Sequence, residues 1–181
     1  MKRFILLLAT VLLCVRMIGE TLVPDSISNP IRTGFHPDPS ICRVGEDYYL
    51  VTSSFTWFPG IPVYHSRDLT NWSLIGHALT NPKAIDFSGM TDNDGIWAPT
   101  LRYHQGTFYL ITTAHGCGGN FYMTVKNPAG PWSDPVWLKD APGIDPSLFF
   151  DEDGRCYYTG NRWDFKSAWP AQCAVWMQEL D

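Results

Sequence analysis

An internal repeat restricts the fold of this 181-residue chain more than any other feature of its sequence. The repeated unit begins Asp-Pro-Ser at Asp38, Ala-Pro-Thr at Ala98 and Asp-Pro-Ser again at Asp145. An aromatic pair follows each tripeptide: Tyr48 with Tyr49, Phe108 with Tyr109, and Tyr157 with Tyr158. Units of roughly 50–60 residues, each holding about four short strands, are typical of the blades of a β-propeller. The repeat therefore predicts an all-β fold of propeller type.

Local composition also indicates β-strands throughout the chain after its first 20 residues. Short runs rich in Tyr, Phe, Val, Ile and Thr alternate with Gly, Pro, Asn and Asp, and no long amphipathic helix is evident. The turn sequences VGED at 44–47 and DEDG at 151–154 each predict a hairpin. A sandwich of ordinary hairpins is the alternative, but a sandwich would not ordinarily place the same tripeptide at the start of successive units.

The repeat count predicts an incomplete ring. Residues 21–181 hold roughly two and a half units, whereas a propeller closes its ring with at least about four blades. We therefore expect this sequence to be the front part of a longer catalytic domain, interrupted within its third blade. The open ring would leave strand edges without partners, and we expect the isolated chain to fold poorly.

The first 20 residues have the pattern of a secretory signal peptide. Lys2 and Arg3 precede an apolar run over residues 4–15, which is too short to span a bilayer. This pattern predicts a protein that is secreted or periplasmic. The net charge of −5 argues against nucleic acid as the main partner.

No metal ion or cofactor is expected from the sequence. The four cysteines after the leader lack zinc-ligand spacing, and either disulfides or unpaired buried thiols are compatible with them: Cys42, Cys117, Cys156 and Cys173. The glycine-rich run at 115–120 is not followed by the Lys-Ser/Thr of a phosphate-binding loop. The acidic stretch at 92–94 lacks a spaced set of calcium ligands, so we expect a solvated turn there.

The two Asp copies of the repeat are the candidate chemical groups. Equivalent positions on the innermost strands of a propeller converge on one mouth of the ring, so Asp38 and Asp145 would face the same space, with Ala98 leaving a gap. Converging carboxylates raise each other's pKa, and one can act as a base while the other tunes it. The proline after each aspartate predicts an extended backbone at the aspartate. The alternative is that each Asp-Pro merely caps a strand.

Three long segments carry a resemblance to a known family. They are NPIRTGFHPDPSICRVGEDYYLVTSSFTWFPGIPVYHSRDLTNW, GIWAPTLRYHQGTFYLITT and PGIDPSLFFDEDGRCYYTGNRW. Together they resemble glycoside hydrolase family 43, especially its β-xylosidases and α-L-arabinofuranosidases, over residues 29–181. The resemblance implies a five-bladed propeller that cleaves terminal xylose or arabinose from hemicellulose-type oligosaccharides with inversion at the anomeric carbon. It does not distinguish xylosides from arabinofuranosides.

The resemblance also implies roles for particular residues. Asp38 falls on the family's general base, and Asp145 falls on the aspartate that tunes the pKa of the general acid and orients it. Trp97 matches the tryptophan that stacks on the sugar, with Phe55 on the sugar's other side. His36 would either contact the substrate or only order the loop before the base.

One catalytic group is missing from the sequence. The family's general acid is a glutamate on the fourth blade, and none of the glutamates present lies in a comparable position: Glu20, Glu46, Glu152 and Glu179. Losing the acid removes a contribution of roughly 10²–10⁴-fold to the rate. The alternatives to an enzyme are therefore a catalytically inactive carbohydrate-binding fragment, or a propeller that serves only as an interaction scaffold.

Overall fold

A computed structural model describes residues 27–163 and 166–180. The chain divides into two compact units, Met1–Ile31 and Arg32–Asp181, and every strand described lies in the second. The predicted signal peptide lies outside the described residues. Within the described residues there is no helix, so none is present that could cross a membrane.

The first sheet is a four-stranded meander. Its strands β1 to β4 pair in sequence order, each antiparallel to the next, and cover Ser40–Val44, Asp47–Val51, Gly60–Ser66 and Ser73–Leu79. The turn between β1 and β2 lies at the predicted VGED sequence, where Gly45 has a φ of 63°. Glycine adopts this left-handed conformation without a steric penalty, which explains its place in the turn.

The second and third sheets repeat this plan. The second contains β6 (Thr100–His104), β7 (Thr107–His115), β8 (Gly119–Val125) and β9 (Val136–Trp137), with the short β5 (Gly95–Ile96) paired to the end of β7. The third contains β10 (Ile144–Phe150), β11 (Cys156–Arg162) and β12 (Ala174–Leu180). The predicted DEDG turn joins β10 to β11.

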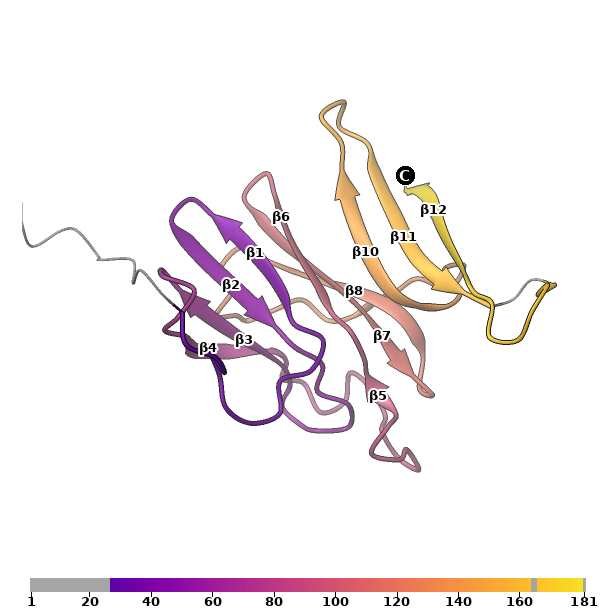
Figure 1. The fold of residues 1–181 in the computed structure, drawn as a ribbon, viewed down its shortest axis with the longest axis horizontal. Helices are drawn as coiled ribbons and strands as arrows, with labels where there is room; N and C mark the ends of the chain where they lie inside the picture. Colours follow the sequence, from indigo (N-terminus) through magenta and orange to yellow (C-terminus); the bar gives the residue numbers. More distant parts are fainter. Residues whose placement is uncertain (1–26, 164–165, 181) are drawn as a thin grey trace, which may run out of the picture. The chain divides into compact units, whose positions relative to one another are not determined.

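Each repeated tripeptide stands at or next to the start of the first strand of its unit (Figure 1). These first strands are β1, β6 and β10, and β6 contacts both of the others. The three sheets therefore lie side by side, with β6 between β1 and β10 (Figure 1). The predicted all-β arrangement of blade-like units is confirmed.

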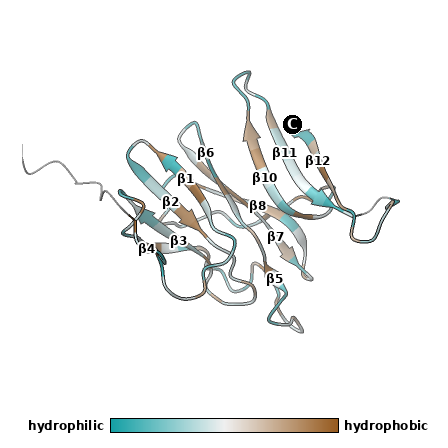
Figure 2. Ribbon diagram, viewed as in Figure 1, coloured by the Kyte–Doolittle hydropathy of each residue, from teal (hydrophilic) through white to brown (hydrophobic). Residues whose placement is uncertain are grey.

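Two apolar clusters join the sheets. The larger combines side chains of the first and second sheets, among them the fully buried Val51, Leu79, Leu101 and Phe121. The smaller joins β7 to the third sheet through Ile111, Leu148 and Tyr158, and in Figure 2 the hairpin tips beyond these clusters are mostly hydrophilic. Burying one such aliphatic or aromatic side chain contributes about 1.5–3 kcal/mol, so these clusters hold the sheets together.

The polar residues of the repeat also link neighbouring sheets. The hydroxyl of Ser40 accepts a hydrogen bond from the Leu101 amide at 3.1 Å. The guanidinium of Arg102 donates to the Leu148 carbonyl at 3.1 Å and to the Ser147 hydroxyl at 2.9 Å. The serine of each Asp-Pro-Ser therefore connects its own sheet to the second sheet.

The four described cysteines are free thiols. Burial raises the pKa of Cys42, Cys117 and Cys156, while Cys173 is exposed. The described cysteines are therefore unpaired, but they are not the buried thiols that the sequence left as one possibility, since three are half-buried and one is exposed.

Candidate functional site

The backbone at the two repeated aspartates differs from the sequence prediction. Asp38 has a φ of 52° and Asp145 a φ of 54°, both in the left-handed region rather than extended. A residue before proline normally prefers extended geometry, and a left-handed non-glycine residue persists only where its surroundings enforce it, at a cost of about 1–3 kcal/mol. Aspartate tolerates this conformation better than most residues. Ala98, at the equivalent position of the second copy, does not share it.

The Asp38 carboxylate is held by a buried hydroxyl. Ser53 Oγ donates a hydrogen bond to Asp38 Oδ2 at 2.6 Å, and only 4% of Ser53 is exposed. The Ser53 amide in turn donates to the Pro37 carbonyl at 3.1 Å. Asp38 itself is exposed to solvent, so one carboxylate oxygen is held while the residue stays accessible.

Asp145 lies within electrostatic reach of Asp38. Partial loss of hydration raises the pKa of the Asp145 carboxyl, and the negative charge of Asp38 raises it further. Burial and the charge of Asp145 together raise the pKa of the Tyr158 hydroxyl to about 12. The two predicted aspartates, at the inner ends of the first and third sheets, are thus close enough for the charge of Asp38 to act on Asp145, and the charge of Asp145 acts in turn on Tyr158.

A buried amide anchors the loop that leads to Asp145. Asn120 Nδ2 lies 2.7 Å from the Ala141 carbonyl, 3.2 Å from the Gly143 carbonyl and 3.0 Å from the Tyr158 hydroxyl. Asn120 Oδ1 accepts a hydrogen bond from the Thr113 hydroxyl at 2.6 Å. Asn120 is only 2% exposed, so this network fixes the third sheet to the second. The sequence alone does not indicate this network, because Asn120 ends a stretch with the composition of an ordinary glycine-rich loop.

Trp97 is supported from one face and at its edge. Its ring stacks on His115 with centroids 3.8 Å apart and planes 9° apart, and its Nε1 donates to the Asn93 carbonyl at 2.7 Å. His115 Nδ1 lies 3.0 Å from Asp94 Oδ1. Hydrogen bonds from Thr91 and then from His115 lower the pKa of Asp94. The predicted solvated turn at 92–94 is found, with Asp92 and Asn93 exposed, and it also supports Trp97.

Phe55 reaches the same region through the backbone. It forms an isolated bridge with Ile96, the neighbour of Trp97, with both amides donating at 2.9 Å. Its ring packs on Phe35 with centroids 5.9 Å apart, and Phe35 packs in turn on Trp57 at 6.0 Å. Phe35 and Trp57 are 61% and 64% exposed. Phe55 is thus tied through the backbone to the neighbour of Trp97, and its ring packs beside two exposed aromatic rings.

The contacts of His36 belong to the loop before Asp38. Its Nε2 lies 3.2 Å from the Thr33 carbonyl, and its ring meets Tyr64 edge-on at 5.7 Å. The Arg32 guanidinium covers the Tyr64 ring at 3.9 Å. His36 also borders a cavity of about 220 Å³ that Ser53 shares. These contacts hold the loop before Asp38, and a substrate contact by His36 at this cavity stays a prediction.

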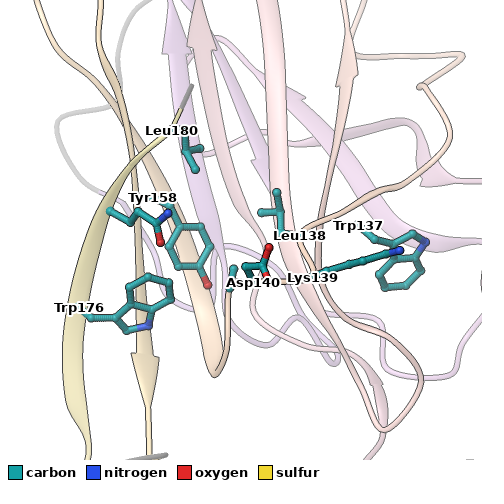
Figure 3. Close-up of a pocket in the computed structure, with 9 residues that line it drawn as sticks. Trp137, Leu138, Lys139, Asp140, Tyr158, Trp176 and Leu180 are labelled. Carbon is teal, nitrogen blue, oxygen red and sulfur yellow. The ribbon is translucent and has the colours of Figure 1, made fainter.

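A larger cavity of about 390 Å³ lies elsewhere, between the β9–β10 connection and the outer strands of the third sheet. Figure 3 shows Tyr158 and Trp176 on one side of it and Leu138 and Asp140 on the other. Neither Asp38 nor Asp145 lines this cavity. Volume alone therefore does not mark the candidate site, which is defined by the paired carboxylates.

The family of the chain follows from a comparison with known sequences. The family description "Glycosyl hydrolases family 43" matches residues 27–181. The chain belongs to glycosyl hydrolase family 43. Across the described residues, the all-β sheets are those of this family of five-bladed propellers.

Individual relatives within family 43 agree. The chain is 51% identical over 161 residues to a xylosidase/arabinosidase of Butyrivibrio fibrisolvens, covering 85% of this chain and 30% of that protein. It is 53% identical over 155 residues to a non-reducing end α-L-arabinofuranosidase of Bacteroides ovatus, covering 83% and 29%. A solved xylan β-1,4-xylosidase of Bacillus halodurans superposes with a TM-score of 0.79 at 47% identity, covering 86% and 31%. The chain thus spans about 30% of the length of these relatives.

Proposed function

We propose that this chain carries the general base and the pKa-tuning aspartate of a glycosidase that releases terminal xylose or arabinose with inversion. The observation that carries the proposal is the pair of equivalent aspartates in enforced left-handed conformations, one held by a buried hydroxyl and the other shifted in pKa. Family membership and the names of the relatives support the reaction class.

In this mechanism Asp38 accepts a proton from water as the water oxygen attacks the anomeric carbon. The bond to the leaving oxygen breaks on the opposite face of the sugar, and a general acid protonates that oxygen. Inversion requires the base and acid carboxyls about 6.5–9.5 Å apart, which leaves room for the water. Asp145 would act on the acid through its charge, raising the acid's pKa until it is protonated at working pH.

The acid would come from a segment beyond this sequence. Among the described glutamates, Glu46 lies in the β1–β2 turn and Glu152 in the β10–β11 turn, while Glu179 on β12 lies 3.7 Å from Arg155. None of these three borders the carboxylate pair. A longer protein is therefore part of the proposal, as is export by the leader at residues 1–20.

The substrate would be held by the aromatics next to the carboxylates. The face of Trp97 opposite His115 would stack on the apolar face of the sugar, with Phe55 beside it. The same support of Trp97 favours the second candidate function, a sugar-binding fragment without catalysis, because sugar stacking needs no acid. The ligand in both cases is a xylo- or arabino-oligosaccharide.

The proposal can be tested with a hybrid enzyme. Residues 27–181 would replace the matching segment of the Bacteroides ovatus arabinofuranosidase, and the hybrid would be assayed on 4-nitrophenyl β-D-xylopyranoside and α-L-arabinofuranoside. We expect hydrolysis of at least one substrate, and a loss of about 10²–10⁴-fold in Asp38→Asn. Asp153→Asn, at an exposed hairpin tip of the third sheet, is the matched control and should leave the rate unchanged.

Two results would contradict the enzyme. A folded hybrid that binds xylose or arabinose in calorimetry without hydrolysing either glycoside would favour the binding fragment. A hybrid whose Asp38→Asn variant keeps full activity would remove the general base from the proposal.

A further inference from the structure

The two aspartates face different residues across their hairpins. Continuing the β1–β2 register by two residues from the Ser40–Val51 pair places Asp38 opposite Ser53. In β10 a bulge separates the Ile144–Asn161 pair from the Ser147–Thr159 pair. The one β11 residue between those pairs is Gly160, so a glycine stands across from Asp145. Equivalent carboxylates thus meet a hydroxyl in one unit and no side chain in the other.

Gly160 cannot be exchanged freely for a hydroxyl-bearing residue. A Cβ added there would lie 2.7 Å from the Tyr158 hydroxyl, whose ring is fully buried. Tyr158 is in turn held by Asn120. The packing under Asp145 therefore keeps a serine-like donor out, whereas the packing under Asp38 contains one.

We propose that Ser53 is a positioning residue for the general base: it fixes the rotation of the Asp38 carboxylate, so that Oδ1 faces the attacking water. This inference rests on the proposed function. The O–H···O distance of 2.6 Å is typical of a charge-assisted hydrogen bond, which holds geometry more tightly than a neutral one. Asp145 has Gly160 and no serine across its hairpin, and this difference would let two aspartates in the same backbone conformation take different roles.

The donor is itself rigid, which positioning requires. The Ser53 amide is tied to the Pro37 carbonyl, directly before Asp38. The neighbouring Ser54 is tied to other partners: its amide donates to the Ile96 carbonyl at 3.2 Å, and its hydroxyl accepts from the Ile61 amide at 3.0 Å. The backbone that carries the Ser53 side chain is therefore fixed, which limits how far the Ser53 hydroxyl can follow a rotating Asp38 carboxylate.

The chain offers a matched set of variants. Ser53→Ala removes the donor, and Ser54→Ala removes a buried hydroxyl that does not contact Asp38. Ser53→Thr keeps the donor, and the second unit already carries a threonine, Thr113, at the equivalent position opposite Ala98. The backbone of these units therefore accommodates the extra methyl group.

The hybrid enzyme provides the kinetic test. We expect Ser53→Ala to lower kcat by about 10- to 100-fold, the effect of a misplaced catalytic group, with KM within about twofold. Ser54→Ala should leave kcat nearly unchanged, and Ser53→Thr should restore most of the rate. A Ser53→Ala variant with normal kcat, a change in KM alone, or an equal loss in Ser54→Ala would each overturn the inference.

A structural readout separates this inference from the proposed function. Crystal structures of the hybrid with Ser53 and with Ser53→Ala would show the orientation of the Asp38 carboxylate directly. A rotated or disordered carboxylate in Ser53→Ala supports positioning, and an unchanged carboxylate overturns it. If the hybrid with Ser53 intact is folded but inactive, the proposed function fails, and this comparison still decides whether Ser53 holds the carboxylate.

Discussion

Replacing Asn120 tests how the third sheet, and with it Asp145, is held in place. The Asn120 side chain takes part in four contacts at 2.6–3.2 Å, to Thr113, Ala141, Gly143 and Tyr158. The side-chain amide has two N–H donors and Oδ1 accepts one bond, so three full hydrogen bonds at about 0.5–1.5 kcal/mol each are counted, and Asn120→Ala should lower the free energy of unfolding by about 1.5–4.5 kcal/mol. The loss lies toward the upper end, because the partners left behind are buried and no longer satisfied.

The assay is urea denaturation of the hybrid enzyme followed by tryptophan fluorescence, since Trp137 and Trp176 both line the cavity beside the hydrogen-bond network. A domain typically has a free energy of unfolding of about 5–15 kcal/mol, so the expected loss is a large part of the total. Asn127→Ala is the control, because Asn127 is exposed and its side chain caps only the Ala129 amide at 3.2 Å. A loss for Asn120→Ala no greater than that of Asn127→Ala would refute the reasoning.

Three further predictions concern the surroundings of the site. Gly143→Ala should destabilise the protein far more than Gly45→Ala in the same denaturation assay. Both glycines have a positive φ, but a Cβ added at Gly143 would overlap the Asn161 carbonyl, whereas a Cβ added at Gly45 has no atom within 4 Å. Comparable losses would contradict this. His115→Leu should weaken xylose or arabinose binding about 2- to 12-fold in calorimetry of the hybrid by freeing the Trp97 ring, given that a stacking pair is worth about 0.5–1.5 kcal/mol; an unchanged Kd would show that His115 does not support the stacked position of Trp97. Tyr158 has a pKa raised from 10.0 to about 12, so the folded chain binds its proton more tightly than the unfolded chain, and the stability this contributes is complete below pH 10 and lost as the pH rises to 12. The fall in Tm over that range should be smaller in Tyr158→Phe, and an identical fall would contradict the assignment.

Much of the fold could be predicted from local sequence. The tripeptides, the aromatic pairs and the turns at VGED and DEDG predicted hairpins, and these are found at β1–β2 and β10–β11. Such features depend on residues close in sequence, where turn chemistry and strand propensity act directly. The repeat also predicted that Asp38 and Asp145 would face the same space, since the equivalent first strands of neighbouring units lie side by side.

The conformation and partners of the site residues were decided by tertiary structure. Local preference predicted an extended backbone before each proline, but the surroundings enforce a left-handed φ at Asp38 and Asp145. Ser53 could have been found from the sequence, because residues at equal distances before and after the β1–β2 turn face each other, and this rule pairs Asp38 with Ser53.

No comparable signal in the sequence pointed to the residues that support Trp97 and Asp145. His115 stacks on Trp97, and Asn120 reaches Tyr158, only because separate hairpins are packed together. The sequence by itself determined the strands, their turns and the equivalent positions of the two aspartates in the repeat. The packing between sheets decided which aspartate meets a hydroxyl, because a buried donor or a close ring contact depends on residues that lie next to each other only in the folded chain.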